Sequence, residues 1–456
     1  MTASTLPLRL KLSWATGAFG VSILMNGVSA FALFYFTTVV GIAPAVAGFL
    51  IFVSRVFDAV TDPLSGWISD RTESRWGRRR PYLLAGSFVS ALAFLMVFTV
   101  PFQGPFDGYW SGNGLVTAGY VLLALLIYTS GYSLFNVPYM AMPAEMTDGY
   151  HERSEIHGYR VMATAAGSFV LQVLAGTVLE YGGRDWDAHA AMGWAGAGLI
   201  FAAMLTTTIG TRAASQSKQQ PPSTLSLVEQ ARSFFGNRAF QQILAVKLAQ
   251  LIGISASSGG LVFLLVNVLD QPLTLLPIIG GATTVAVLGC TGLLVWLSRH
   301  IGKRGGYLLS AAVTGLTALS WTLALPGEPV WLLALRGFLL GIAFSGNVMF
   351  AMSMLTDAME VDRLKTGLRR EGMYSAFYSF VEKLASSIGP LIMGTALTIA
   401  GFKPDPTQQD PEAVRQAILV GIAYVPALMA VIACVILTFY KLDESSLRAL
   451  RETPKE

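Results

Sequence analysis

Long apolar runs alternate with short polar segments along the whole chain. Six runs fall at about 13–40, 43–68, 81–102, 116–144, 159–182 and 189–211, and six more at about 241–268, 272–298, 306–325, 329–356, 374–401 and 414–440. Each run is close to the ~20 residues that a helix needs to cross the hydrocarbon core of a bilayer. The pattern therefore predicts an all-α integral membrane protein with twelve transmembrane helices.

A long polar interruption at 212–240 separates the first six runs from the last six. Its start, TRAASQSKQQPPST, is polar and contains proline, whereas its end, LSLVEQARSFF, has the apolar spacing of a helix lying on the membrane surface. We expect residues 1–211 to form an N-terminal six-helix half and 212–240 to form a cytoplasmic linker. Residues 241–456 would form a C-terminal six-helix half with a cytoplasmic tail.

Similar loops occur at equivalent positions of the two halves. SRWGRRRPYLL (74–84) follows the second run and SRHIGKRGGYLL (298–309) the eighth; MTDGYHERSEIHGYR (146–160) follows the fourth run and LTDAMEVDRLKTGLRR (355–370) the tenth. Parallel six-helix repeats, with substrate and ion bound near the bilayer midplane, predict this similarity. The alternative is that basic loops resemble one another without any repeat.

The distribution of basic residues between the loops predicts the orientation. The odd-numbered connections, such as VGIAP, FQGPFDGYWSGNG and DQP, are nearly free of Lys and Arg, whereas the even-numbered ones are rich in both. Basic loops stay on the cytoplasmic side. We therefore expect both termini to be cytoplasmic, in agreement with an even number of spans, and the protein to lie in the plasma (bacterial inner) membrane.

The composition agrees with a chain embedded in lipid. Of the 456 residues, 53% are hydrophobic and 13% are charged, compared with about 25% charged residues in soluble domains. The net charge of +4 does not indicate a nucleic-acid partner, because the basic residues of membrane proteins gather in cytoplasmic loops. The cysteines, Cys290 and Cys434, lie inside apolar runs and the four histidines are scattered, so we expect no disulfide framework, thiolate or zinc site and no cofactor.

The second apolar run contains three ionisable residues in the stretch RVFDAVTDP: Arg55, Asp58 and Asp62. At helical spacing all three share one face. Two carboxylates one turn apart in a low dielectric repel, so a proton or a bound Na⁺ is needed between them. Thr61 offers a hydroxyl as a further ligand. Arg55 would pair with whichever carboxylate the cation does not bind. The alternative is a static ion-pair network that joins two helices.

Few other polar residues lie at membrane depth. Asn136 occurs in the fourth run, with Ser133 one turn earlier, and Glu382 and Lys383 occur in the eleventh. A buried ammonium needs an anion, so Lys383 is the expected second-half partner of the acids in the second run. Glu382 is on another face and is either structural or functional. Lys247 and Arg336 lie nearer the helix ends, where long side chains extend to the membrane surface.

The stretch RVFDAVTDPLSGWISDRTESRWGRRRPYLL resembles the signature of the glycoside–pentoside–hexuronide:cation symporters of the major facilitator superfamily. KLSWATGAFG, NVPYMAM, ERSEIHGYR and DRLKTGLRREGMYSAFYSFVEK also match, so the resemblance covers nearly the whole chain. It implies the major facilitator fold, twelve helices in two six-helix halves, and Na⁺- or H⁺-coupled symport of a sugar by alternating access. A monomer in the lipid bilayer, with a small-molecule substrate, is the default of the superfamily.

The resemblance also implies roles for individual residues. The coupling cation would be bound by Asp58, Asp62, Thr61 and Ser133. The substrate would be bound by Ser22, Met25, Tyr132, Asn136, Met140, Arg160, Val348, Tyr378 and Lys383. The cytoplasmic gate would contain Asp70, Arg71, Arg78, Asp148 and Asp357.

Some positions depart from the pattern of the melibiose-permease branch. Two acids that bind sugar hydroxyls there are replaced by Ser22 and Asn136, a lysine is replaced by Val21, and a tryptophan by Met140. The cavity expected from Val21, Met25 and Val348 is rather apolar. A carbohydrate is the default substrate, and a less polar solute such as an aryl glycoside or a lysolipid is the alternative.

Two other classes of protein compete with a symporter. D-x-x-x-D motifs also hold Mg²⁺ in intramembrane prenyltransferases, but these need a second acid-rich motif, and 272–298, the counterpart of the second run, contains no acid. A non-transporting sensor on the same scaffold is the other possibility, which coupled flux of ion and solute would exclude. We therefore expect a transporter and not an enzyme.

Overall fold

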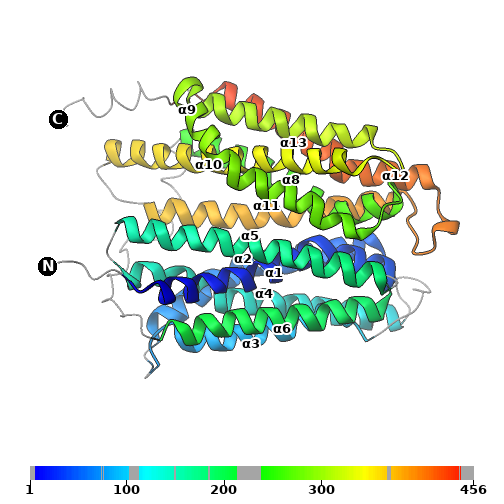
Figure 1. Ribbon diagram of the computed structural model, residues 1–456, viewed down its shortest axis with the longest axis horizontal. Coiled ribbons are helices and arrows are strands. Elements are labelled where there is room, and N and C mark those ends of the chain that lie inside the picture. Colours follow the sequence, from blue (N-terminus) through cyan, green and yellow to red (C-terminus); the bar gives the residue numbers. More distant parts are fainter. Residues whose placement is uncertain are drawn as a thin grey trace. The chain divides into compact units, whose positions relative to one another are not determined.

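The computed structural model describes residues 6–72, 74, 76–101, 112–147, 150–182, 185–212, 238–366, 371–440 and 442, and every regular element in these ranges is a helix (Figure 1). The first six are α1 (Leu8–Phe34), α2 (Pro44–Arg71), α3 (Arg80–Phe98), α4 (Gly112–Met146), α5 (Tyr150–Tyr181) and α6 (Trp186–Gly210). They are followed by α8 (Arg238–Asn267), α9 (Leu276–Ser320), α10 (Val330–Thr366), α11 (Glu371–Ile399), α12 (Pro411–Leu419) and α13 (Val425–Thr438). Most of the predicted linker, 213–237, lies outside the described residues.

Five short elements complete the described chain. The π-helical segments η1 (Tyr35–Val39) and η5 (Val420–Tyr424) continue α1 and join α12 to α13, respectively. The 3-10 segments are η2 (Leu273–Leu275), η3 (Trp321–Leu323) and η4 (Pro406–Gln408).

The described helices agree with the predicted twelve spans. Eleven segments of the described chain are long and apolar enough to cross a membrane. Two of them lie in α9, which turns at Gly302 with a φ of +72°, a conformation that favours glycine. This turn falls between the predicted spans 272–298 and 306–325. The remaining long helix, α11, contains Glu382 and Lys383, which lower its mean hydropathy.

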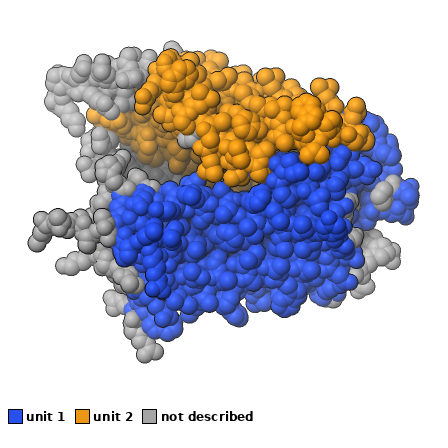
Figure 2. Space-filling model, in the orientation of Figure 1, with its two compact units in different colours: residues 1–220, 258–280, 390–418 blue, residues 221–257, 281–389, 419–456 orange. Residues whose placement is uncertain are grey.

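The chain forms two compact units (Figure 2). Unit 1 comprises 1–220, 258–280 and 390–418, and unit 2 comprises 221–257, 281–389 and 419–456. The segments 258–280 and 390–418 belong to unit 1 because their backbone packs on the first helices. A Cβ added at Gly176 of α5 would lie 2.7 Å from the carbonyl oxygen of Leu273, and one at Gly48 of α2 would lie 2.5 Å from that of Pro390. The predicted division into halves at 212–240 stays a prediction.

In unit 1, helices pack where glycines let their backbones approach. α3 lies against α4 and α6, α1 against α5 and α6, and α2 against α4 (Figure 1). A Cβ at Gly86 of α3 would lie 2.6 Å from the backbone nitrogen of Phe135, and one at Gly131 of α4 would lie 2.8 Å from that of Ser90. Small residues at interhelical contacts are typical of membrane helices, because association in lipid depends on close packing.

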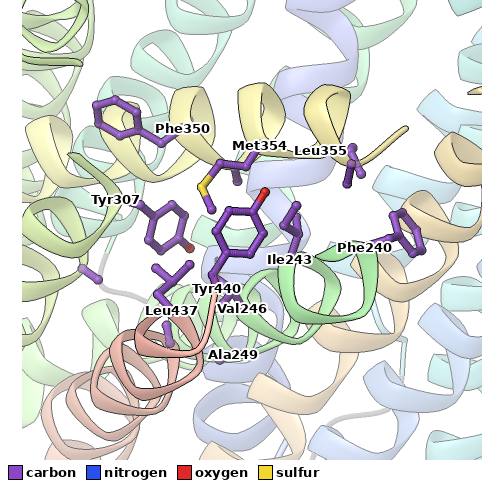
Figure 3. Close-up of a cluster of buried hydrophobic side chains, with 14 of the residues drawn as sticks. Phe240, Ile243, Val246, Ala249, Tyr307, Phe350, Met354, Leu355, Leu437 and Tyr440 are labelled. Atoms are coloured by element: carbon purple, nitrogen blue, oxygen red, sulfur yellow. The ribbon is translucent and has the colours of Figure 1, made fainter. Parts of the chain in front are cut away.

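The core of unit 2 is an apolar cluster to which five helices contribute (Figure 3). Its larger members are Phe240, Ile243 and Val246 of α8, Tyr307 of α9, Phe350, Met354 and Leu355 of α10, Tyr378 of α11, Leu437 of α13, and Tyr440 beyond its end. The rings of Tyr307 and Tyr440 point into the space between α8, α10 and α13. This packing fixes one face of α8 within unit 2.

Two basic residues that we expected to extend to the membrane surface are buried. Lys247 is 4% exposed and Arg336 is 5% exposed. Arg336 forms a bidentate ion pair with Glu328, with one nitrogen–oxygen distance of 2.8 Å, and its Nε donates to the Ser320 hydroxyl at 3.0 Å. The prediction was wrong because each cation finds an acidic partner inside unit 2, so it need not reach water.

An ion-pair cluster joins the beginnings of α1 and α5. Lys11 Nζ lies 2.6 Å from Glu155 Oε2 and 3.4 Å from Glu152 Oε1. Glu152 also accepts hydrogen bonds of 2.5 Å from the Thr147 hydroxyl and from the Leu6 N–H. These donors, the Thr147 hydroxyl above all, lower the pKa of Glu152 from its ordinary value of 4.5 because they favour the charged carboxylate.

This cluster predicts a pH dependence of stability. The folded-state pKa of Glu152 is below the unfolded value of 4.5, so its stabilising contribution is present above pH 4.5 and is lost as the pH falls through the folded-state pKa. The thermal unfolding midpoint of the purified protein should show this loss when it is measured from about pH 3 to about pH 7. That interval spans the range over which carboxyl groups titrate. Glu152→Gln should lower the unfolding midpoint at neutral pH and weaken its acid dependence, whereas Asp187→Asn, at an exposed acid of α6, should change neither. An identical pH profile for Glu152→Gln and the wild type would contradict the assignment.

Candidate functional site

The two carboxylates of α2 meet a serine of α4. Asp58 is 1% exposed and Asp62, one turn later on the same face, is partly buried. The Oγ of Ser133 lies 3.0 Å from Asp58 Oδ1 and 2.5 Å from Asp62 Oδ1. Three of the four residues predicted to bind the cation thus lie around one point in unit 1.

Thr61 is the fourth residue predicted for this site. Its Oγ1 lies 3.3 Å from the Asp58 carbonyl oxygen and 3.4 Å from Ser133 Oγ. The Ser65 hydroxyl, which was not predicted to belong to the site, donates to the Ser133 carbonyl oxygen at 3.1 Å. Together these contacts fix the position of Ser133 opposite α2.

One hydroxyl proton cannot serve both carboxylates. Ser133 carries a single O–H, so it donates to Asp58 or to Asp62 but not to both at once. Two carboxylates one turn apart thus share a single hydroxyl proton at this point, and a bound proton or a small hard cation would reduce the repulsion between them. The donor set consists only of carboxylate and hydroxyl oxygens, which suits H⁺ or Na⁺ and not a soft transition metal.

Arg55 connects α2 to α1 and α4. Its NH2 group donates to Ser29 Oγ at 3.1 Å and its NH1 group to Met25 Sδ at 3.6 Å. The guanidinium carbon lies 5.6 Å from the centroid of the Tyr128 ring, and the Asp58 carboxylate interacts electrostatically with the same group. We expected pairing with a carboxylate; the hydrogen bonds described for Arg55 run to α1, while its charge stays within the field of Asp58.

A stripe of side chains follows one face of α4 beside the carboxylates. Tyr128, Tyr132, Asn136 and Met140 recur every four residues, which places them on one face. Asn136 Nδ2 donates to the Tyr132 hydroxyl at 2.9 Å, and Tyr132 interacts electrostatically with Asp58 and Asp62. Met140 at the end of the stripe is exposed. Tyr128 was missed from the sequence, although its spacing from Tyr132 was a signal.

Ser22 of α1 is held in a hydrogen-bond network with α5. Its hydroxyl donates to the Thr164 carbonyl oxygen at 2.8 Å and lies 2.7 Å from Ser168 Oγ. Asn26 Nδ2 donates to both Ser22 Oγ, at 3.1 Å, and Ser168 Oγ, at 2.8 Å. Asn26 is exposed and was also missed; an amide in the middle of an apolar run, one turn after Ser22, was the signal.

Arg160 of α5 is partly buried, and its Nε has no hydrogen-bond partner among the described residues. The hydroxyl of Tyr139, with which Arg160 interacts electrostatically, likewise has none in this part of the chain. Tyr139 is stacked on Trp14 at a centroid distance of 4.6 Å. A guanidinium with a spare donor suits a ligand that accepts hydrogen bonds.

The other predicted substrate residues lie in unit 2. Val348 of α10 and Lys383 of α11 are partly buried, and Tyr378 of α11 is buried. Lys247 of α8 lies 3.7 Å from Glu382 and 5.6 Å from the centroid of the Tyr378 ring. The sequence did not predict that Lys247 and Glu382 pair with each other.

The predicted gate residues are described in part. Asp357 of α10 forms an ion pair with Lys303, with nitrogen–oxygen distances of 2.6 and 2.8 Å. The guanidinium carbon of Arg71 lies 4.1 Å from the centroid of the Trp67 ring, and Arg78 is partly buried. Asp148 and the side chain of Asp70 lie outside the described residues.

Comparison with known proteins identifies the family. The sequence profile described as "MFS/sugar transport protein" matches residues 13–444. The isoprimeverose transporter of Lactiplantibacillus pentosus is 27% identical over 95% of this chain and 88% of the relative. A putative glycoside/cation symporter of Escherichia coli is 23% identical over 98% of this chain and 94% of the relative.

The fold has a solved counterpart. The crystal structure of the nucleoside transporter NupG superposes with a TM-score of 0.62 over 98% of this chain and 100% of that one, at 15% sequence identity. This likeness shows the fold, and the profile match shows the family, so the alternative of an intramembrane transferase falls away. The chain therefore belongs to the MFS/sugar transport protein family and is an integral membrane transporter with the major facilitator fold.

Proposed function

We propose that this protein is a symporter that couples the entry of a glycoside or related sugar to a Na⁺ or H⁺ gradient. The observation that carries the proposal is the Ser133 hydroxyl between the carboxylates of Asp58 and Asp62, an all-oxygen site with excess negative charge. The names of two relatives, a glycoside/cation symporter and an isoprimeverose transporter, support the substrate class.

The bound cation would neutralise the excess negative charge of this site. It would be held by Asp58, Asp62, Ser133 and Thr61, with Arg55 stabilising the remaining negative charge from the side of α1. Protonation would act in the same way by neutralising one carboxylate. Because the neutral, loaded site no longer needs water around it, the carrier with ion and solute bound can reorient across the membrane, whereas the unloaded charged site resists.

The solute would bind beside the cation. Tyr132, Asn136, Met140 and Arg160 supply hydroxyl, amide, apolar and guanidinium groups from α4 and α5, and Met25 lies against Arg55. Val348, Tyr378 and Lys383 are the proposed contributors from unit 2. Coupling arises because ion and solute each favour the same loaded state, so each strengthens binding of the other.

The proposal extends to the arrangement in the membrane. Six-helix halves at 1–211 and 241–456 would alternate access to the site, with Asp70, Arg71, Arg78, Asp148 and Asp357 at the cytoplasmic gate. The Lys303–Asp357 ion pair described above is the kind of contact that such a gate would form and release. Both termini would be cytoplasmic and the carrier would act as a monomer in the plasma membrane.

Uptake by proteoliposomes tests the function. We would compare isoprimeverose, methyl β-glucoside, methyl β-xyloside, an aryl glycoside and a lysolipid, each with an imposed Na⁺ gradient, an imposed pH gradient and neither. Accumulation of a sugar under one gradient, abolished by an ionophore for that ion, is the expected result. Uptake of only the aryl glycoside or lysolipid would mean that the carrier moves amphiphiles, and no gradient-driven uptake would contradict symport.

A further inference from the structure

A second polar cluster is buried in unit 2, away from the carboxylates of α2 in the sequence. Its centre is Lys247 of α8, whose side chain is 5% exposed and whose Nζ lies 3.7 Å from Glu382 Oε1. The ammonium has one described partner, the Glu382 carboxylate, although it carries three N–H donors.

Two further polar groups beside Lys247 are without partners. Among the described residues, neither the Tyr378 hydroxyl nor Gln250 Nε2 has a hydrogen-bond partner, although Tyr378 is 5% exposed and Gln250 is 8% exposed. The other end of the Gln250 amide is fixed, because its Oε1 accepts a hydrogen bond from the Tyr307 hydroxyl at 3.4 Å. Buried polar groups in folded proteins are normally hydrogen-bonded, so unpaired ones suggest a ligand.

The four side chains share two adjoining helix faces. Lys247 and Gln250 are three residues apart on α8, and Tyr378 and Glu382 are four residues apart on α11, so each pair lies on one face of its helix. Lys247 joins the two pairs, because it contacts both Glu382 and the Tyr378 ring. The Lys247 ammonium is therefore close to both the Glu382 carboxylate and the Tyr378 ring, and Gln250 lies on the same face of α8 as Lys247.

Glu382 is the exposed member of this cluster. Its side chain is 45% exposed, although it lies near the middle of α11. A charged carboxylate at that depth would carry a large energetic penalty in hydrocarbon, so this inference requires its exposed side to face water.

We propose that Lys247, Gln250, Tyr378 and Glu382 form a hydroxyl-binding site for a neutral sugar. This inference rests on the proposed function and adds Lys247, Gln250 and Glu382 to Tyr378, which the resemblance already implies for substrate binding. One sugar hydroxyl would donate to Glu382, and its neighbour would accept from Lys247 or Tyr378, since a hydroxyl both donates and accepts. The ion pair carries no net charge, so the charge of an anionic or a cationic solute would stay uncompensated in this partly buried site.

Tyr378→Phe gives the sharpest test, because it removes a hydroxyl that the described fold does not use. We expect its unfolding midpoint to equal or exceed that of the wild type while sugar affinity falls about 3- to 10-fold, the effect of one neutral hydrogen bond. Glu382→Gln should weaken binding about 10- to 100-fold, because it removes a charged acceptor. Glu412→Gln, at an exposed acid of α12, is the matched control and should change neither quantity.

Binding would be measured by calorimetry on the purified full-length protein with isoprimeverose, methyl β-glucoside, methyl β-xyloside and methyl β-glucuronide. The neutral sugars should bind more tightly than the glucuronide. Wild-type affinity in both Tyr378→Phe and Glu382→Gln, with gradient-driven sugar uptake intact, would overturn this site and leave the proposed function standing. If the wild type neither binds nor accumulates any of these sugars, the proposed function fails and the site with it. Should Glu382→Gln not fold, Tyr378→Phe alone decides.

Discussion

Asp62→Asn is expected to abolish ion-driven solute uptake while leaving the protein folded. Asp62 lies 2.5 Å from the Ser133 hydroxyl and supplies one of the two negative charges that the coupling ion would neutralise. An amide keeps the shape and can still hydrogen-bond to Ser133, but it cannot bind a cation by charge or take up a proton near neutral pH. Loss of a charged ligand contact of about 1.5–3 kcal/mol should weaken apparent ion affinity about 10- to 100-fold.

Two transport assays separate loss of coupling from loss of function. Accumulation against a solute gradient should disappear in Asp62→Asn, whereas exchange of labelled for unlabelled solute at equal concentrations should persist, because the neutral amide removes the charge that opposes reorientation of the unloaded site. Asp187→Asn changes an exposed acid of α6 in the same way and should behave like the wild type in both assays. Undiminished accumulation by Asp62→Asn would show that the coupling ion binds elsewhere. Ser133→Ala should give an intermediate loss, since both carboxylates remain.

Arg336→Met is expected to cause the largest loss of stability. Arg336 is buried with Glu328, which it contacts through two nitrogens, and its guanidinium carbon lies 4.6 Å from the centroid of the Trp321 ring. Removing the cation leaves a buried carboxylate without its charge partner, which destabilises proteins by about 3–5 kcal/mol. The thermal unfolding midpoint in detergent should therefore fall markedly.

The double variant Arg336→Met/Glu328→Leu distinguishes the mechanism. Replacing both charges by apolar groups removes the unpaired carboxylate, so most of the lost stability should return. Arg415→Met, in the exposed pair with Glu412 at 3.4 Å, should cost less than about 1 kcal/mol, as surface ion pairs do. An unfolding midpoint of Arg336→Met as high as that of Arg415→Met would show that the buried pair contributes little to stability.

The partners of Lys247 and Arg336 could not be predicted from the sequence. Their positions nearer helix ends predict side chains that extend to the membrane surface. In the structure Arg336 reaches Glu328, eight residues earlier, and Lys247 reaches Glu382 on another helix. A position along a helix indicates depth in the membrane but not which neighbour the side chain meets.

The sequence by itself determined the number of spans, the family and the local charge set. A bilayer requires about 20 apolar residues per helix, so the spans appear directly in the pattern. The pairing of Asp58 and Asp62 follows from helical spacing alone. Their likeness to known symporters also identified Ser133, 71 residues after Asp62, as a member of the site.

Only the tertiary structure decided which polar side chains are already engaged and which remain available. It placed Ser22 and Asn26 in a network with α5, directed Arg55 toward Ser29, and brought Lys247 beside Glu382. A helix that is apolar on every side gives no indication of the face that packs against its neighbours. These contacts therefore depend on how each helix is rotated and how closely it approaches its neighbours. Glycines at the interfaces permit the close approach, but the order of residues along one helix does not reveal which helices meet.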